Sequence, residues 1–382
     1  MNAFRRICAL LVGIVLFLAG FLKLMDPLGA SLVVEEYFKF FHVGFLTFAS
    51  KVVAEILSLL ETIIGAALIV CVKPRLTCIA AWIMMAVFTA ITAILWFFDP
   101  PMDCGCFGQA IHLTHAQSFW KNLILCALLA IATLPLSKFG QTRKSKYVGF
   151  AIAVITVLFF AAYSLVSIPA MDFTSFAPGA EFMPESVASD RVLIYEKNGK
   201  EGAFSLGAAL PDSSWTFLRE ELSGDSLYND GREAVELSFS DADGEYCDSL
   251  LFRGELMVVS VYDADRLDDD EWCEVASFTA DATTAGYLPI VLVASTPGAI
   301  GDKLSELSLA PCSYYADRRT LMTFNRSNGG VTFIRDGEIV RKWASSSRPD
   351  ADVLAGVIEK NSRSHLSVQG VLLYVFAVML LL

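Results

Sequence analysis

Charged residues are scarce in this sequence of 382 residues: they make up only 18% of it, whereas hydrophobic residues make up 55%. A soluble globular domain usually carries about 25% charged residues. Positive charge is in particularly short supply, since the net charge is −12 and no run of Lys and Arg forms a basic patch. The first shortage excludes a wholly soluble chain. The second argues against nucleic acid as a partner.

The sequence also lacks the short motifs that hold common cofactors. It contains no C-x-x-C-H haem motif, no glycine-rich phosphate loop and no pair of histidines on a predicted helix. Haem, flavin and nucleotide are therefore not expected, and no cofactor is certain from motifs alone.

Long apolar runs are what the chain has in abundance. A membrane-crossing helix needs roughly 20 such residues, and five runs approach that length. The predicted spans cover residues 4–24, 49–71, 77–98, 118–136 and 147–168. A sixth run, residues 368–382, is short for a full crossing and is consistent with a thin span, a tail anchor or an interfacial segment.

The orientation of the spans follows from Lys and Arg near their ends. Basic residues lie at Arg5–Arg6, at 73–75 and at 138–146, and these points fall on one side if every span crosses. That side is the expected cytoplasmic one. The loop 99–117, and the soluble region after the fifth span, then face outward. The sequence predicts a multi-pass protein of the bacterial plasma membrane, surrounded by lipid, with a soluble domain on the periplasmic side.

The outward loop contains "PPMDCGCFGQ", in which one glycine separates Cys104 from Cys106. Disulfides persist on that oxidising side. Gly105 permits the tight bend that a disulfide between these cysteines needs. So small a ring is expected to be strained and readily exchanged, which favours a catalytic redox pair. A structural disulfide is one alternative, and a zinc site shared with His112 and His115 is a weaker one, because the spacing is not standard.

Ionisable residues inside predicted spans are costly and often functional. The second span carries Glu55 and Glu61, which lie about 120° apart on a helix and need not share a face. Each is a candidate proton relay or polar intramembrane site, and an interhelical hydrogen bond is the alternative. Lys23 is expected to extend to the interface. Cys126, in the fourth span, is a secondary thiol candidate or a packing residue.

Three stretches of the membrane half resemble a known family: "GIVLFLAGFLKLMDP", "ETIIGAALI" and "DCGCFG". Over residues 4–137 they resemble the DoxX superfamily, and within it the branch of MauE, named for methylamine utilisation. The resemblance implies a four-helix membrane bundle with a redox role in maturing exported, disulfide-rich proteins. DoxX-like proteins are associated with sulfur or thiol oxidation and with quinone, so quinone is the one cofactor that the resemblance suggests.

The outer region alternates strand and helix patterns. The strands are predicted in "ELMVVSVYDA", "LPIVLVAST" and "GGVTFIRDGEIVRKW", the last with a hairpin turn at Asp336-Gly337. A helix is predicted in "DDDEWCEVASFTADATTA" between the first two. This order, over residues 250–345, resembles a thioredoxin-like domain. The expected C-x-x-C is absent, and Asn328-Gly329-Gly330 stands where thioredoxins have a cis-proline.

Two outer cysteines remain as secondary thiol candidates. Cys273 follows a run of four acidic residues, which disfavours a thiolate. A pairing with Cys312, or a single-cysteine exchange role, is the alternative to a domain that only docks a partner.

The complete prediction is an α-helical membrane bundle, with a four-helix DoxX/MauE-like core and extra spans, joined to an α/β thioredoxin-like soluble domain. Its expected parts are the bundle (1–140), a fifth span and linker (141–170), a β-rich or irregular segment (171–249), the thioredoxin-like domain (250–350) and a hydrophobic end (366–382). The expected function is thiol–disulfide exchange for exported client proteins through Cys104 and Cys106. The rivals are a non-catalytic scaffold that binds a partner and a sulfur-compound or quinone oxidoreductase subunit.

Overall fold

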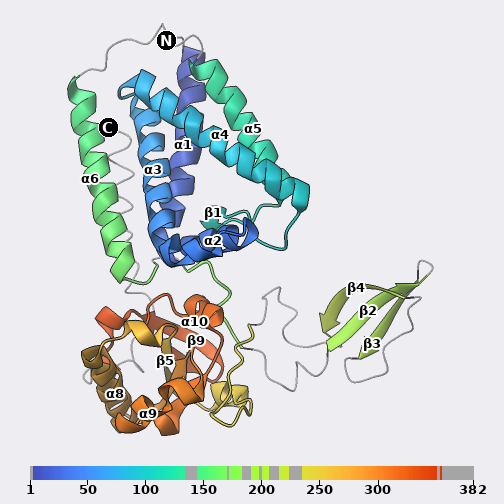
Figure 1. Ribbon diagram of the computed structural model, residues 1–382, viewed down its shortest axis with the longest axis vertical. Coiled ribbons are helices and arrows are strands. Elements are labelled where there is room, and N and C mark those ends of the chain that lie inside the picture. Colours follow the sequence, from blue (N-terminus) through green and yellow to red (C-terminus); the bar gives the residue numbers. More distant parts are fainter. Residues whose placement is uncertain are drawn as a thin grey trace. The chain divides into compact units, whose positions relative to one another are not determined.

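The structure is a computed structural model, and it divides into two units that are described separately here: one ends at Phe173 and the other begins at Thr174. Figure 1 shows the elements of both. The described residues are 3–133, 144–169, 172–182, 191–197, 200–205, 215–222, 235–350 and 353–354.

The first unit is helical. Five of its described helices are long and apolar enough to cross a membrane, and they span Phe4–Met25, Gly44–Val70, Pro74–Phe98, His115–Thr133 and Lys144–Val166. This confirms the predicted helical membrane bundle. The sixth predicted run, 368–382, lies outside the described residues. The helices are α1 (Ala3–Met25), α2 (Pro27–Phe40), α3 (Ser50–Val70), α4 (Pro74–Phe98), α5 (His115–Thr133) and α6 (Lys144–Val166), with a 3₁₀ turn over Gly44–Ala49.

Helices α1 and α3 lie side by side (Figure 1) because small residues let their backbones approach closely. A Cβ placed on Gly20 would lie 2.6 Å from the backbone nitrogen of Thr62, and a Cβ on Gly65 would collide with the backbone of Phe17. Gly13 faces Gly65 in the same seam. These contacts fix the two helices that later position the ion pair of the candidate site.

Helix α2 follows α1 after a sharp break at Asp26-Pro27. The Asp26 carboxylate caps the new helix by accepting a hydrogen bond from the backbone N–H of Gly29 at 2.9 Å, and Pro27 occupies the first helical position. The apolar face of α2 packs against α3 through Ala30, Val34 and Ala54. Helix α2 therefore covers part of the bundle without being long enough to count among the spans.

The second unit contains a mixed five-stranded sheet of order β7-β6-β5-β8-β9. Strands β5, β6 and β7 are parallel, whereas β8 runs antiparallel to β5 and pairs with β9 in the predicted hairpin. The elements are β5 (Glu255–Val261), α8 (Asp269–Thr284), β6 (Leu288–Val293), α9 (Pro297–Glu306), β7 (Ser313–Tyr315), α10 (Arg318–Phe324), β8 (Gly330–Arg335) and β9 (Glu338–Trp343). The mixed sheet with its helices agrees with the predicted α/β class.

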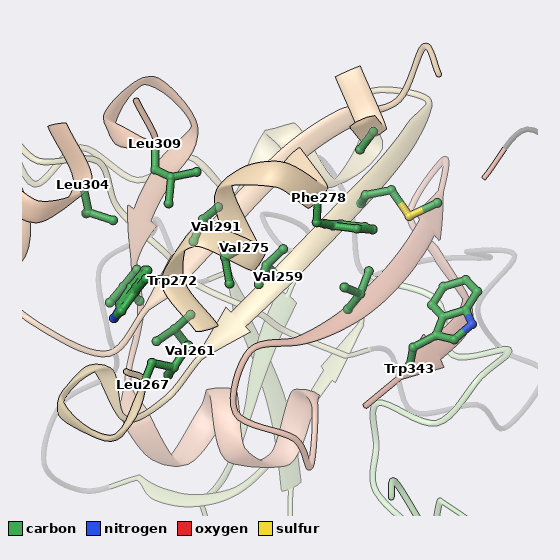
Figure 2. Packing of buried hydrophobic residues seen from close by; sticks show 14 of the residues in the cluster. Val259, Val261, Leu267, Trp272, Val275, Phe278, Val291, Leu304, Leu309 and Trp343 are labelled. Atoms are coloured by element: carbon green, nitrogen blue, oxygen red, sulfur yellow. The ribbon is translucent and has the colours of Figure 1, made fainter. Parts of the chain in front are cut away.

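Both faces of this sheet are buried, which explains the continuous apolar runs in its central strands. Figure 2 shows one cluster, in which Val259 and Val261 of β5 meet Trp272 and Val275 of α8 and Leu304 of α9. The opposite face packs against α10 and the segment 235–239; its cluster includes Leu256, Val258, Leu321, Phe324 and Phe239. The result is three layers, with the helices α8 and α9 on one side of the sheet.

A separate three-stranded antiparallel sheet of order β3-β2-β4 precedes the α/β sheet in sequence. Strands β2 (Arg191–Lys197) and β3 (Lys200–Ser205) pair in antiparallel fashion, with Lys197 opposite Lys200. Strand β4 (Thr216–Leu222) pairs with the other edge of β2.

Candidate functional site

The thiol pair lies in the loop between α4 and α5, at the start of β1 (Cys106–Gln109). Gly105 has a φ of +60°, and a Cβ at this position would collide with the side chain of Val33 on α2. Glycine is required here on both counts, because only glycine adopts this backbone conformation freely and fits against Val33. The sequence "CGC" thus bends both cysteines toward the bundle.

The two thiols are free and their sulfur atoms lie 3.1 Å apart, in hydrogen-bond contact. Cys104 is only 5% exposed, and its backbone carbonyl accepts a hydrogen bond from the hydroxyl of Tyr37 on α2. Cys106 is half-buried. The loop is therefore held by α2 at the first cysteine and is more accessible at the second.

A cavity of about 120 Å³ lies beside the pair. It has contributions from α1, α2, α3, α4 and α5 as well as from the loop. Most of the lining side chains are apolar, and the charged ones are Lys23, Glu61 and Lys121. The full lining consists of Lys23, Ala30, Val33, Val34, Tyr37, Ala54, Leu57, Ser58, Glu61, Phe88, Ile91, Thr92, Cys104, Gly105, Cys106 and Lys121.

A buried ion pair forms one wall of this cavity. The Lys23 ammonium lies 2.6 Å from the Glu61 carboxylate, and the two side chains are 15% and 4% exposed. The same ammonium lies 5.5 Å from the centre of the Phe88 ring. The expectation that Lys23 extends to the interface is therefore wrong: a carboxylate on the neighbouring helix holds its ammonium inside the bundle.

The two glutamates of the second span have different surroundings, which agrees with a separation of about 120° on the helix. Glu61 lines the cavity, whereas Glu55 does not. Both Glu55 carboxylate oxygens are buried and have no hydrogen-bond partner among the described residues. Only Glu61 is thus brought to the thiol pair.

The two histidines of the weak zinc alternative are not brought to the thiols. His115 is buried, and its ring nitrogens lie 2.9 Å from the Asp99 carboxylate and 2.9 Å from the Met102 carbonyl. His112 lies 3.2 Å from the Asp103 carboxylate at the surface. Within the described part of the chain, no three His, Cys, Asp or Glu side chains gather as a metal site. His115 instead ties the loop to the start of α5.

Cys126 lies away from the pair, in the seam between α4 and α5. Its sulfur is 3.6 Å from the hydroxyl of Thr89, and its side chain packs against the apolar cluster around Met85 and Leu129. These contacts match the packing alternative for this residue.

Cys273 and Cys312 of the second unit are also free thiols. Cys273 is exposed on α8, and Cys312 is half-buried with its thiol donating to the Leu309 carbonyl at 3.2 Å. The loop after β5 is fixed by Asn328, whose side-chain amide makes reciprocal hydrogen bonds of 3.0 and 2.7 Å with the backbone of Asp263. An amide-to-backbone clamp therefore holds Asn328 against the end of β5.

Sequence reasoning missed two residues that line the cavity, Tyr37 and Lys121, and one buried residue beside the thiols, Ser118. Ser118 is fully buried beside both thiols, and Lys121 lies with its ammonium 4.7 Å from the centre of the Phe107 ring. The available signal was the spacing of Ser118 and Lys121, since residues three apart share a helix face.

Comparison with known families now adds to this geometry. Residues 1–135 match the family described as Methylamine utilisation protein MauE. The match covers 135 of the 382 residues and includes the thiol loop and the whole lining of the cavity. The membrane half is therefore MauE-like, and the chain is a multi-pass membrane protein.

The second unit also matches a family model, of a different kind. Residues 190–222, which contain the three-stranded sheet, match a domain of unknown function (DUF8463). No curated protein and no solved structure matches the chain. The wider DoxX resemblance and the thioredoxin resemblance stay predictions.

Proposed function

We propose that this protein carries out thiol–disulfide exchange for exported proteins, with electrons passing through Cys104 and Cys106. One observation carries the proposal: two free thiols, 3.1 Å apart, open on a cavity that also holds a buried lysine–glutamate pair. Ionisable groups inside a membrane bundle are retained mainly for function. Their convergence on two thiols supports redox chemistry at this point.

The surroundings of the pair favour exchange over a structural clip. A structural disulfide needs only two packed sulfur atoms and no open space beside them. Here Cys104, Gly105 and Cys106 all line the cavity. The Tyr37 hydroxyl already holds the loop through the Cys104 carbonyl. The loop is thus anchored without a disulfide, which leaves the thiols available for chemistry.

We further propose that the chain lies in a bacterial plasma membrane with its α/β domain on the outer side, where this domain recruits the client or redox partner. The thioredoxin-like interpretation rests on the parallel β5 and β6 followed by the antiparallel β8–β9 hairpin. Without a C-x-x-C, the domain is better suited to docking than to exchange. The name of the matched family refers to methylamine utilisation, and no narrower client is drawn from that name.

The cavity also suits the ring of a quinone as the electron acceptor. Its volume of about 120 Å³ is near that of a cavity of roughly 150 Å³ that accepts benzene. Val33, Leu57, Phe88 and Ile91 provide apolar walls. A quinone would supply the capacity to accept two electrons and two protons, and Lys23 and Lys121 would hold its oxygen atoms.

The test is thiol trapping in cells that express the full chain. A membrane-impermeant maleimide is added before and after mild reduction to the wild type, Cys104→Ser, Cys106→Ser and the control Cys126→Ser. We expect a pair that is reduced and re-oxidised readily, and mixed disulfides with other proteins in at least one single variant of the pair but not in the control.

A pair that stays oxidised under mild reductant, with variants that trap nothing, would overturn the proposal in favour of a structural clip. Loss of function in Glu61→Gln with normal redox cycling of the thiols would favour a transporter or a sulfur-compound enzyme instead. Maleimide that reacts only after the membrane is opened would contradict the outward orientation.

A further inference from the structure

The surroundings of Cys106 contain an unusual buried hydroxyl. Ser118 is fully buried, yet its hydroxyl oxygen has no hydrogen-bond partner among the described residues. The hydroxyl lies near Cys104 and Cys106, and it lowers the pKa of both thiols. A buried hydroxyl without a partner is destabilising, so its natural partner here is a sulfur anion.

Positive charge exceeds negative charge around the same cavity. Lys23 and Lys121 both line it, and the one lining carboxylate, Glu61, lies 2.6 Å from Lys23. Lys121 makes no ion pair within the described ranges, and its ammonium lies over the Phe107 ring. A partly buried ammonium is stabilised by an anionic partner, and Cys106 lines the same cavity as Lys121.

Helix α5 supplies both of these side chains. It begins at His115, and Ser118 and Lys121 lie one turn apart on it. Because residues three apart share a helix face, the hydroxyl and the ammonium both act on Cys106 from this helix.

The two thiols respond differently to this environment. The hydrogen bond between them lowers the pKa of Cys106, and Lys121 and Lys23 lower it further against the effect of burial. The same hydrogen bond raises the pKa of Cys104, and burial raises it further. Cys104 is also the less exposed of the two, at 5%. One thiol is thus favoured as the anion, and the other as the proton donor.

We propose that Cys106 is the reacting thiolate of the pair, that Ser118 and Lys121 are the positioning residues that stabilise it, and that Cys104 is the resolving thiol. The assignment rests on the proposed exchange function and deepens it. In the reducing direction, the Cys106 thiolate attacks one sulfur of a client disulfide, so that a Cys106–client bond forms and the other client sulfur leaves as a thiolate.

The second half of the exchange consumes the intermediate. The Cys104 sulfur attacks Cys106, the Cys104–Cys106 disulfide forms, and the second client sulfur leaves. The thiol proton of Cys104 passes to a departing client thiolate. Two electrons have then moved from the pair to the client, and the reverse sequence oxidises a client dithiol.

The experiment measures alkylation of each thiol as a function of pH. The full chain is purified in detergent in the reduced form, treated with N-ethylmaleimide between pH 4.5 and 9, and analysed by peptide mass spectrometry so that each cysteine is resolved. In Cys104→Ser, we expect half-maximal labelling of Cys106 at least one pH unit lower than that of Cys104 in Cys106→Ser.

The positioning residues are tested in the Cys104→Ser background. Adding Lys121→Met should raise the half-maximal pH of Cys106 labelling by about one unit or more, and Ser118→Ala should raise it by less. Lys121→Arg should restore the low value, because it keeps the charge. Lys39→Met is the matched control, since Lys39 pairs with Glu35 on the exposed side of α2.

Two results would overturn the assignment: faster acid labelling of Cys104 than of Cys106, or a Cys106 profile that neither Lys121→Met nor Ser118→Ala shifts. If Lys121→Met does not fold, Ser118→Ala decides the question alone. No client is needed, so an acid-shifted Cys106 that traps no protein in cells would leave this assignment standing and remove only the proposed exchange function.

Discussion

The helical bundle and the α/β domain each contain a lysine–carboxylate pair beside an aromatic ring, and the two pairs differ in exposure. In the bundle, Lys23 and Glu61 form an ion pair whose side chains are 15% and 4% exposed, next to two thiols. In the α/β domain, the Lys303–Asp269 pair has exposed fractions of 36% and 95%, and the core around Trp272 is apolar.

This difference matters because a buried ion pair can lower the stability of the fold, whereas an exposed pair hardly changes it. Exposed ion pairs add little stability and are easily replaced. A buried pair must overcome the loss of hydration of both groups, and an apolar pair of similar volume is often as stable. The bundle therefore carries a polar cluster that folding does not require, and this cluster surrounds the thiol loop.

The strongest way to break the comparison is Glu61→Gln, which leaves the Lys23 ammonium buried without its carboxylate. Removing one partner of a buried ion pair costs about 3–5 kcal/mol, so thermal unfolding in detergent should shift to much lower temperature. Glu35→Gln is the control, because its pair with Lys39 (2.8 Å) lies at the surface and should cost about 0.3–0.5 kcal/mol. The double variant Glu61→Gln/Lys23→Met should recover most of the loss, and equal losses from the two glutamines would contradict the buried pair.

A smaller loss of folding stability is expected from Gly105→Ala. The new methyl group would collide with Val33 while the backbone keeps a φ of +60°, and left-handed strain plus overpacking should total about 2–4 kcal/mol. Because the loop would have to move, alkylation of the buried Cys104 should become faster. Gly244→Ala is the matched control in the outer region: its φ is +90° with no atom within 4 Å of the added carbon. If both variants lose equal stability, the contact with Val33 is not tight.

The α/β domain offers a still smaller test at the start of α8. The Asp268 carboxylate accepts from the Glu271 N–H at 2.8 Å, and the Glu271 carboxylate accepts from the Asp268 N–H at 3.1 Å. Asp268→Ala removes this capping box and should cost about 1 kcal/mol, seen as faster amide exchange in the first turn of α8. Thr296→Ala, at the start of α9, removes no side-chain cap and should change little. If Asp268→Ala and Thr296→Ala changed amide exchange equally, the capping box would not be what stabilises α8.

Local patterns were enough to predict the membrane spans and the β8–β9 hairpin, although not α2, α9 or α10. The spans follow from apolar runs of bilayer length, and the β8–β9 hairpin follows from Asp336-Gly337, where Asp336 has a φ of +47° and Gly337 one of +86°. The thiol pair was also predictable, because its two members are neighbours in sequence and Gly105 permits the bend.

The rest of the candidate site depends on tertiary packing. Tyr37, Lys121 and Ser118 come from α2 and α5, and nothing in the local sequence relates them to Cys106. Lys23 was misread for the same reason: near the end of a span, a lysine usually extends to the interface, unless a neighbouring helix offers a carboxylate. The close approach of α1 and α3 at Gly20 and Gly65 is what brings Glu61 within reach.

The smallest loss of folding stability is expected from Lys303→Met in the α/β domain. Its ammonium lies 2.9 Å from the Asp269 carboxylate and 5.5 Å from the centre of the Trp272 ring. The ion pair is exposed to solvent, since the two side chains are 36% and 95% exposed, and a methionine at this position keeps an aliphatic side chain beside the tryptophan. The loss should not exceed about 1 kcal/mol, measured by thermal unfolding of the full chain, and it should shrink further in high salt. A loss as large as that of Glu61→Gln would mean that the outer domain also depends on its charges, and the contrast between the two regions would no longer hold.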